Sequence, residues 1–270
     1  DFAHREYAVA CANAGKHMII EKPLATTRED ADAIMEAIQR NGVRAMVDFH
    51  NRWSPPFALM KEEIRQGAIG QPYSAYIRLN DQKWVPTDML KWSAKSSVLW
   101  FLGSHATDTL RWLFDSEVDT VYTVSRAGLL QGDGVDSVDV YQSIYTFRNG
   151  CIAQVEDGWI TPNGGPNVND FKCSILGTEG MYQLDLSSHN MIQRYTSDRT
   201  TVPDVLVNNF VRDTAAGFAY QSIRHFVDAM IGGYDFYVSL KDAYNVTMTV
   251  LAVLESAKCG QPVKVSGLLD

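Results

Sequence analysis

The feature that most constrains the fold is a strand–helix–strand pattern within residues 1–49. His17 to Glu21 is a short apolar run, the kind that forms a strand buried on both faces of a parallel sheet. A helix is expected next, with Thr26 and Glu29 as its capping box and Gly42 directly after its end. Arg44 to Phe49 then has the composition of a second strand. Because strands joined by a helical crossover lie parallel, this region is predicted to be the C-terminal part of a doubly wound Rossmann domain.

A shorter helix is expected ahead of the first strand. Glu6 to Ala14 is rich in alanine, and Gly15 follows where a left-handed cap is favoured. Asp1 stands just before this helix and is not a methionine. We therefore expect an upstream segment that completes the domain.

Beyond residue 49 the pattern changes to alternating strands. In Asp136 to Phe147, Val138, Val140 and Ile144 share one face and the aromatic residues share the other. Asn149-Gly150 is a strong hairpin signal, so Cys151 to Ile160 is predicted to return antiparallel. Further strands are expected at residues 73–79, 120–125, 171–176 and 181–186.

Three helices are predicted around these strands. One begins at Pro55-Pro56 and ends near Gln66. Another covers residues 217–230, and its apolar face carries Ile223, Phe226, Val227 and Met230. The last covers residues 241–258 and is capped by Ser239 with Asp242. Residues 50–270 are therefore predicted to form an α+β domain, with a large, mainly antiparallel, open-faced sheet and helices on one side. Its open face is expected to carry aromatic residues and to be a substrate floor or a subunit interface.

Composition excludes several classes of protein. With 46% hydrophobic and 21% charged residues the chain is globular. A net charge of -8 without a basic run argues against nucleic acid as a partner. No apolar run approaches the roughly 20 residues of a membrane helix. Four scattered cysteines indicate reduced thiols in a cytoplasmic protein, and the six histidines show no metal-ligand spacing.

The most specific local signal is Glu21-Lys22-Pro23, at the predicted carboxyl end of a buried strand. Ligands of open parallel sheets lie at that end. Because proline restricts the residue before it, the ammonium group of Lys22 is directed and could polarise an oxygen or relay its proton. The alternative is a solvated lysine at the end of a strand.

These residues resemble the Gfo/Idh/MocA family of oxidoreductases. The segment AGKHMIIEKPLATT resembles the family's Ala-Gly-Lys-His, apolar strand, Glu-Lys-Pro and Thr-initiated helix. The resemblance continues through Asn51-Arg52, the turn from Gly67 to Gly70, the segment Gly103 to Asp108 and the turn Gly177 to Gly180. It covers almost the whole chain and lacks only the N-terminal dinucleotide-binding fingerprint.

The resemblance implies an enzyme that uses NAD or NADP to oxidise or reduce a sugar, cyclitol or sugar derivative. The family's catalytic lysine corresponds to Lys22, and its catalytic histidine corresponds to His105. Oxidising a secondary alcohol needs a base for the hydroxyl proton while hydride leaves for the nicotinamide. The alternative for His105 is a histidine at a helix start that is bonded to backbone, with Asp108 on the same face. Without the upstream fingerprint, these 270 residues alone are expected to be inactive and to bind dinucleotide poorly.

Two departures from the family pattern stand close to His105. The family's aspartate four residues earlier is Phe101 here, and the preceding glycine run is Lys95-Ser96-Ser97. Loss of the aspartate removes a carboxylate that could raise the basicity of the histidine, and it predicts a more apolar pocket. It also leaves open a second hypothesis, a non-catalytic relative that senses dinucleotide or sugar.

The remaining site expectations follow the same resemblance. Residues expected near the cofactor are His4, Glu21, Lys22, Pro23, Arg52 and Trp53. Residues expected near the substrate are Lys22, Trp84, Lys91, Trp92, Phe101, His105 and Asp108. The alternative for Arg52 and Trp53 is that they seal the junction between the two domains. The alternative for Trp84 and Trp92 is that they pack within a loop. Relatives commonly pair through the open sheet, so a homodimer or homotetramer is expected.

Overall fold

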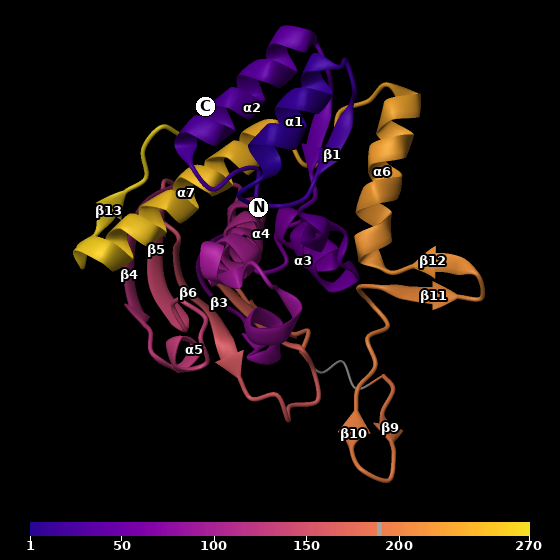
Figure 1. Ribbon diagram of the computed structural model, residues 1–270, viewed down its shortest axis with the longest axis vertical. Helices are drawn as coiled ribbons and strands as arrows, with labels where there is room; N and C mark the ends of the chain where they lie inside the picture. The colour runs from indigo at the N-terminus through magenta and orange to yellow at the C-terminus, as the bar shows by residue number, and fades with distance from the viewer. Residues whose placement is uncertain (188–190) are drawn as a thin grey trace.

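The computed structural model describes residues 1–187 and 191–270. Its N-terminal part consists of α1 (His4–Asn13), β1 (Met18–Ile20), α2 (Arg28–Asn41) and β2 (Ala45–Val47). Strands β1 and β2 pair in parallel, with Ile19 opposite Met46. The predicted strand–helix–strand unit is therefore confirmed, and Figure 1 shows α1 and α2 beside its two strands.

The start of α2 differs from the prediction by one residue. Thr27, rather than Thr26, is the N-cap, and its side chain accepts a hydrogen bond from the backbone N–H of Asp30 at 3.1 Å. The expected pairing of Thr26 with Glu29 is wrong, because two successive threonines offer the same cap chemistry in adjacent registers. Gly42 ends the helix in the left-handed conformation, as expected, at φ 60°.

The second part is built on one seven-stranded sheet with the order β13-β4-β5-β6-β3-β7-β8. Strands β3 and β6 run parallel, and the other neighbouring strands pair antiparallel. The predicted fold class, a Rossmann remnant followed by a mainly antiparallel sheet domain, is confirmed. The strands are β3 (Pro72–Gln82), β4 (Val118–Arg126), β5 (Val140–Phe147), β6 (Ile152–Thr161), β7 (Asn169–Gly177), β8 (Met181–Asp185) and β13 (Val263–Lys264).

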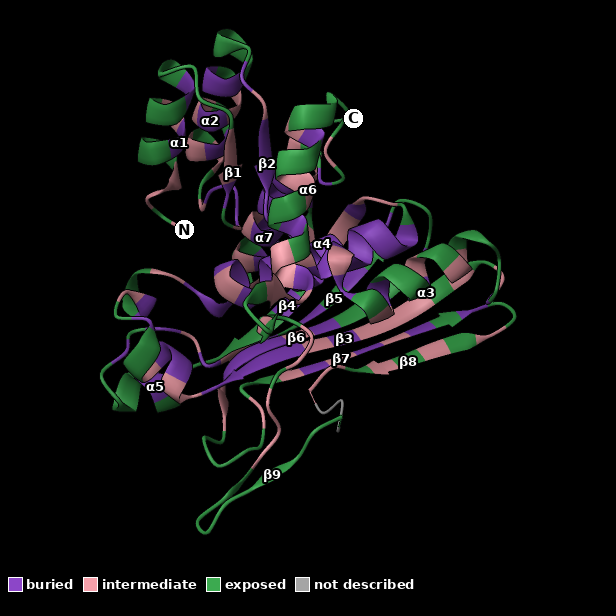
Figure 2. Ribbon diagram, turned by 90° about the vertical axis from the view of Figure 1, so that its right-hand side faces the viewer, coloured by how far each residue is buried: buried purple, intermediate pink, exposed green. Residues whose placement is uncertain are grey.

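Helices cover one face of this sheet. Figure 2 shows α3, α4 and α7 on the same side of the strands, and the capping box of Ser239 with Asp242 at the start of α7 is confirmed. The longer helices are α3 (Pro55–Arg65), α4 (Ser104–Phe114), α6 (Phe218–Gly232) and α7 (Leu240–Cys259). Short turns are η1 (His50–Trp53), η2 (Val85–Met89), η3 (Ser93–Lys95), η4 (Leu99–Gly103) and α5 (Leu129–Gly132).

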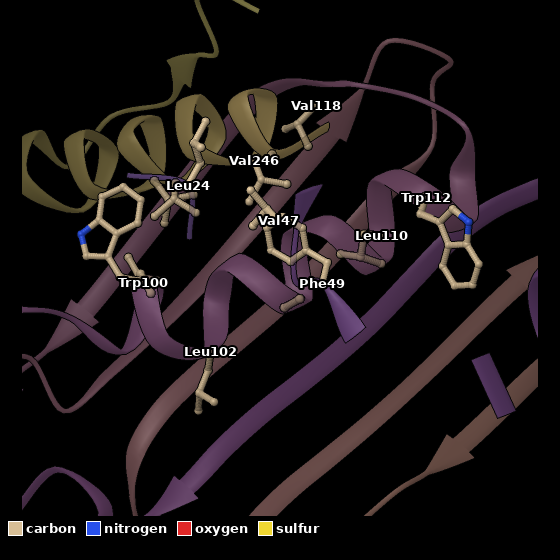
Figure 3. Packing of buried hydrophobic residues seen from close by; sticks show 14 of the residues in the cluster. Leu24, Val47, Phe49, Trp100, Leu102, Leu110, Trp112, Val118 and Val246 are labelled. Carbon is tan, nitrogen blue, oxygen red and sulfur yellow. The ribbon is translucent and has the colours of Figure 1, made fainter. Parts of the chain in front are cut away.

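A single apolar core joins the two parts. Leu24 and Val47 of the N-terminal part lie close to Val246 of α7 and Leu110 of α4 (Figure 3), and all four side chains are buried. Burying apolar surface stabilises the folded state by about 25 cal/mol for each Å² removed from water. The core therefore fixes the carboxyl ends of β1 and β2 over the sheet domain.

The aromatic residues of β5 do not lie on the open face. Tyr141, Tyr145 and Phe147 are buried under the helices, and the outward positions of β5 include Ile144, which is 45% exposed. The alternation was predicted correctly, but its two faces were assigned the wrong way round. Helices α4 and α7 need large apolar partners, which the aromatic side chains supply.

Residues 191–216 form elements for which no prediction was made, and α6 packs differently from the prediction. Small hairpins form from β9 (Arg194–Tyr195) with β10 (Thr200–Thr201) and from β11 (Asn209–Val211) with β12 (Thr214–Ala216). On α6, Ile223 and Val227 are exposed, whereas Phe226 and Met230 of the same predicted face are half-buried, so the expected packing of that face is confirmed only in part. The helix instead buries Phe218, Ser222 and Ala229.

Two further observations concern the chain as described. In residues 1–187 and 191–270, no helix has the length and apolar character needed to cross a membrane. Within the same residues, no group of three or more His, Cys, Asp or Glu side chains is arranged to hold a metal ion.

Candidate active site

A cavity of about 340 Å³ lies where the carboxyl ends of β1 and β2 meet the helix-covered face of the sheet. Its lining comes from segments that are far apart in the sequence. They are Glu21, Lys22, His50, Asn51, Leu79, Phe101, Leu102, His105, Asn169, Phe171, Leu186, Asp204, Leu206, Val207 and Phe218. Apolar side chains with a few convergent polar groups are typical of small-molecule sites.

Lys22 lies two residues after the end of β1, and its side chain reaches η4, the short turn directly before α4. The ammonium donates a hydrogen bond to the backbone carbonyl of Phe101 and lies 4.2 Å from the centre of the Phe101 ring. Burial lowers the pKa of Lys22 to about 8, partly offset by the negative charges of Glu21, Asp81 and Asp48. Lys22 is therefore mainly an ammonium at neutral pH but can lose its proton under mildly alkaline conditions.

His105 is the second residue of α4 and faces the same cavity. It is 6% exposed, and its Nδ1 has no hydrogen-bond partner within the described part of the chain. Burial, followed by the positive charges of Lys22 and His50, holds its pKa well below 6.5. At neutral pH the ring is therefore an uncharged imidazole that can accept a proton.

A second histidine, His50, lies beside His105 and was not predicted from the sequence. The two ring centres are 4.7 Å apart, and His50 Nδ1 lies 3.6 Å from Asp48 Oδ2. In the described chain, Asn51 Nδ2 and Asp48 Oδ1 are buried without hydrogen-bond partners. These residues directly follow β2, so the rule that found Lys22 after β1 could also have found them.

The sheet contributes a buried polar pair that sequence reasoning also missed. Asn169 of β7 donates a hydrogen bond from its side chain to Oδ1 of Asp81 on β3. Asp81 is 1% exposed, and burial raises its pKa to about 7, partly offset by Lys22 and Asn169. The two residues are opposite each other in the antiparallel register. The two residues are far apart in the sequence and meet only because β3 pairs with β7. No local sequence pattern predicts this contact.

Phe101 makes one wall of the cavity apolar. Its ring lies 5.9 Å from the Trp159 ring and 6.3 Å from the Trp92 ring. Trp92 in turn contacts Phe2, with ring centres 6.2 Å apart. The phenyl ring at this position therefore belongs to an aromatic cluster that extends behind the cavity.

Arg52, Trp53 and Asp108 lie outside the cavity. Arg52 is bound to Asp108 through Nε–Oδ2 at 2.9 Å and Nη2–Oδ1 at 2.6 Å, and both side chains are buried. Trp53 packs its ring against His225 and Tyr237. Arg52 thus binds both carboxylate oxygens of Asp108. The positions of Arg52 and Trp53 correspond to the alternative in which they seal the domain junction.

The other expected residues do not line the cavity. His4 shares a 2.7 Å hydrogen bond between its Nδ1 and the carbonyl of Pro23, so it lies directly behind Lys22. Trp84 donates from Nε1 to Gln82 at 2.8 Å, and Lys91 is exposed. Of the expected residues, the structure thus brings Glu21, Lys22, Phe101 and His105 to one cavity.

Comparison with protein-family models gives two matches in chain order. Residues 1–49 match the model described as "Oxidoreductase family, NAD-binding Rossmann fold", and residues 61–265 match "Oxidoreductase family, C-terminal alpha/beta domain". Both belong to the Gfo/Idh/MocA group of models.

Two curated relatives are similar in sequence. The chain is 32% identical to levoglucosan dehydrogenase from Pseudarthrobacter phenanthrenivorans, over 73% of this chain and 56% of that protein. It is 30% identical to 1,5-anhydro-D-fructose reductase from Ensifer adhaerens, over 67% of this chain and 55% of that protein. The match thus spans about half the length of each relative.

A solved structure has the same fold. The scyllo-inositol dehydrogenase from Lactobacillus casei, determined with bound NAD(H) and scyllo-inositol, superposes with a TM-score of 0.79 at 19% identity. The superposition covers 98% of this chain and 77% of that one.

Proposed function

The chain belongs to the Gfo/Idh/MocA oxidoreductase family, and on that premise we propose that it forms part of an NAD(P)-dependent enzyme. The proposed reaction transfers hydride between nicotinamide and a secondary alcohol, or its ketone, on a sugar, cyclitol or sugar derivative. The observation that carries this proposal is one cavity lined by both the Lys22 ammonium and the uncharged His105 imidazole.

The residues at the carboxyl ends of β1 and β2 fit the nicotinamide end of a dinucleotide. Ligands of open parallel sheets bind there, and the unpaired Asn51 Nδ2 is a buried donor at this edge within the described chain. Glu21, Lys22, His50 and Asn51 would surround the group. When bound, the nicotinamide supplies the hydride acceptor or donor.

The protein's own residues would manage the oxygen and its proton. In oxidation, His105 accepts the hydroxyl proton while the Lys22 ammonium donates a hydrogen bond to the same oxygen. In reduction, Lys22 polarises the carbonyl and His105 returns a proton. The oxidation roles agree with the charges of these groups at neutral pH, since burial keeps the imidazole uncharged and Lys22 remains mainly protonated. In reduction, His105 must first take up a proton before it can return one.

The cavity wall supports a substrate with exposed carbon faces. Phe101, Phe171 and Phe218 contribute aromatic surface, against which the C–H face of a sugar ring packs well. The two curated relatives are named for levoglucosan and 1,5-anhydro-D-fructose, which supports a sugar derivative as the substrate class.

A second function is a regulatory protein that binds dinucleotide or sugar without turnover. The observation in its favour is that the Lys22 ammonium already donates to the Phe101 carbonyl and lies over that ring. A lysine held in this way needs to shift before it can serve a substrate oxygen.

The experiment that separates the two functions uses the complete protein with NAD or NADP and a panel of sugars and polyols. We expect turnover by the parent and a loss of about 10²- to 10⁴-fold in kcat/KM for Lys22→Ala and for His105→Ala. Lys16→Ala is the matched control, because Lys16 is an exposed lysine after α1. Tight dinucleotide binding without turnover would favour the regulatory function, and normal turnover in Lys22→Ala would contradict the role of Lys22.

A further inference from the structure

Residues 204–218 form one wall of the cavity. They contribute the side chains of Asp204, Leu206, Val207 and Phe218 to its lining. The segment includes the hairpin of β11 with β12 and ends at the first residue of α6. None of these four side chains takes part in the proposed proton transfer, so the role of this 204–218 wall lies with the rest of the substrate.

The carboxylate of Asp204 folds the start of the wall. Its Oδ1 accepts hydrogen bonds from the backbone N–H groups of Leu206 and Val207, each at 3.1 Å. Its Oδ2 accepts from the backbone N–H of Asn208 at 2.8 Å. These donors engage both oxygens of Asp204, so the carboxylate sets the course of the chain along the cavity.

The wall is fastened to the first turn of α6. The backbone N–H of Phe218 donates to the carbonyl of Leu206 at 2.8 Å, and that of Ala219 donates to the carbonyl of Val207 at 3.1 Å. Gly217 permits this close approach, because its φ is +95° and a Cβ there would lie 2.6 Å from the carbonyl oxygen of Val207. The backbone of the wall is therefore held in place relative to Phe218.

Phe218 brings the wall close to the proposed catalytic histidine. Its ring centre lies 5.7 Å from that of His50, and the ring centre of His50 lies 4.7 Å from that of His105. Phe218 and His105 also line the same cavity. A substrate whose oxygen is bound by His105 therefore has its neighbouring atoms within reach of the wall.

The surface around the wall is apolar. Leu206 and Phe218 share the cavity lining with Leu79 of β3, Phe171 of β7 and Leu186, which follows β8. A hydroxyl group placed against such side chains loses its hydrogen bonds to water without gaining others, whereas burial of carbon is favourable. A cyclitol with a hydroxyl on every ring carbon would bring hydroxyl groups against this surface.

From this arrangement we propose that the 204–218 wall is a specificity-determining subsite for an apolar substituent of the substrate. The substrate is then a glycoside with an apolar aglycone rather than a free, fully hydroxylated sugar or cyclitol. The position of the reacting carbon in this inference rests on the proposed function. A cavity of about 340 Å³ is near the lower end of the range for small-molecule sites, which favours a short alkyl or single-ring aglycone.

The test compares matched pairs of substrates with the complete protein and NAD or NADP. Each sugar is supplied free and as its methyl and phenyl glycosides, and kcat/KM is measured from the absorbance of the reduced nicotinamide. We expect kcat/KM for a glycoside to exceed that of its free sugar at least about tenfold, because added carbon in an apolar pocket contributes about this factor. A ratio of one or less for every pair would overturn the inference.

Variants of the wall connect the preference to its residues. Leu206→Asn places a polar group of similar size in the wall, so the ratio of glycoside to free sugar should fall towards one, mainly through a higher KM for the glycoside. Leu59→Asn is the matched control, because Leu59 is 60% exposed on α3 and lies outside the cavity lining. It should keep the ratio of the parent.

A second variant keeps the test open should Leu206→Asn fail to fold. Asp204→Ala removes the acceptor of three backbone hydrogen bonds at an exposed position, which loosens the wall, and the ratio should fall in this variant as well. Ratios in Leu206→Asn and Asp204→Ala equal to that of Leu59→Asn would show that the wall does not determine specificity.

Failure of this inference is distinguishable from failure of the proposed function. Absence of turnover with every sugar and glycoside would contradict the proposed function. Calorimetry of a phenyl glycoside and its free sugar with the dinucleotide-bound protein would still decide the role of the wall. Tighter binding of the glycoside is the expected result, and equal or weaker binding would contradict the inference.

Discussion

Buried ionisable side chains surround the cavity, and their proton affinities share one physical cause. Removing a charge from water is costly, so burial lowers the pKa of Lys22 and His105 and raises that of Asp81 and Asp157. Each group is pushed towards its uncharged form. Such clusters are enriched at functional sites, where they supply acids and bases near neutral pH.

The first prediction concerns the pH dependence of alcohol oxidation in the complete protein. His105 must be uncharged to accept a proton, and its pKa lies well below 6.5. Activity should therefore persist as the pH falls through 6.5 and decline only near the lowered pKa of His105. Lys22 must be protonated, and its pKa of about 8 should set the alkaline limb of kcat/KM. An acidic limb above pH 6.5 in the kcat/KM profile would contradict the assignment of His105.

A second prediction concerns Asp157, which is buried beneath Gly103. A Cβ placed on Gly103 would lie 3.0 Å from Asp157 Oδ2, and Asp157 Oδ1 has no partner in the described residues. Burial, followed by the charge of Glu156, raises its pKa well above 3.8. The folded state therefore binds an extra proton above pH 3.8, and Asp157 reduces stability as the pH rises towards its folded pKa.

Asp157→Asn removes this penalty. Between pH 3.8 and the raised pKa of Asp157, the free energy of unfolding of the variant should exceed that of the parent by an amount that grows with pH. The growth should be at most about 1.4 kcal/mol per pH unit. Urea unfolding of both proteins at acidic and alkaline pH measures the difference, with Asp119→Asn as the control, because Asp119 is a partly solvated carboxylate on β4. A difference that does not depend on pH would show that Asp157 has the same pKa in the folded and unfolded states and would contradict this prediction.

At the scale of elements, a buried ion pair ties η1 to α4, the helix that carries His105. Arg52 holds both oxygens of Asp108 and also donates to the carbonyl of Tyr237 at 3.2 Å. The negative charge of Asp108 and then that of Asp242 more than compensate for the burial of the Arg52 guanidinium and raise its pKa. The pair therefore fixes the helix relative to the segment that follows β2.

Asp108→Asn tests this structural role. Removing one partner of a buried pair leaves an uncompensated charge, so we expect a loss of about 3 kcal/mol in the free energy of unfolding. The remaining contact of Arg52 with Asp242 at 3.4 Å keeps the loss near the lower end of the usual range. Dinucleotide affinity of the folded variant, measured by calorimetry, should equal that of the parent. Weakened dinucleotide binding with unchanged stability would instead support the cofactor role first expected for Arg52.

Elements with local signals could be predicted, and those that depend on distant pairing could not. The helix after Ser239 and the hairpin at Asn149-Gly150 are determined by nearby residues. The parallel pairing of β3 with β6, and the approach of Asn169 to Asp81, depend on the sheet order. For the same reason Lys22 and His105 were found from their motifs, whereas the buried pair of Asn169 and Asp81 was found only in the structure.

At the scale of the whole molecule, the sheet has one face covered by α3, α4 and α7 and an opposite, open face that these helices do not cover (Figure 2). Apolar side chains on neighbouring strands point outwards there, and their exposed fractions are 42% for Tyr122, 45% for Ile144 and 48% for Ile152. Tyr122 and Ile144 are directly opposite in the register. Contiguous exposed apolar surface on a sheet is typical of an interface, and we propose that copies of the protein associate through it.

Ile144→Lys is the variant that tests this association. A lysine at the centre of a self-complementary interface would meet its own symmetry mate or bury an unpaired charge, so the dimer dissociation constant should rise at least about tenfold. Sedimentation of the complete protein at several concentrations measures it. Ile231→Lys is the matched control, because Ile231 is 83% exposed on α6, away from the sheet. If Ile231→Lys dissociates the assembly and Ile144→Lys leaves it intact, copies associate through α6 and the open face has another role.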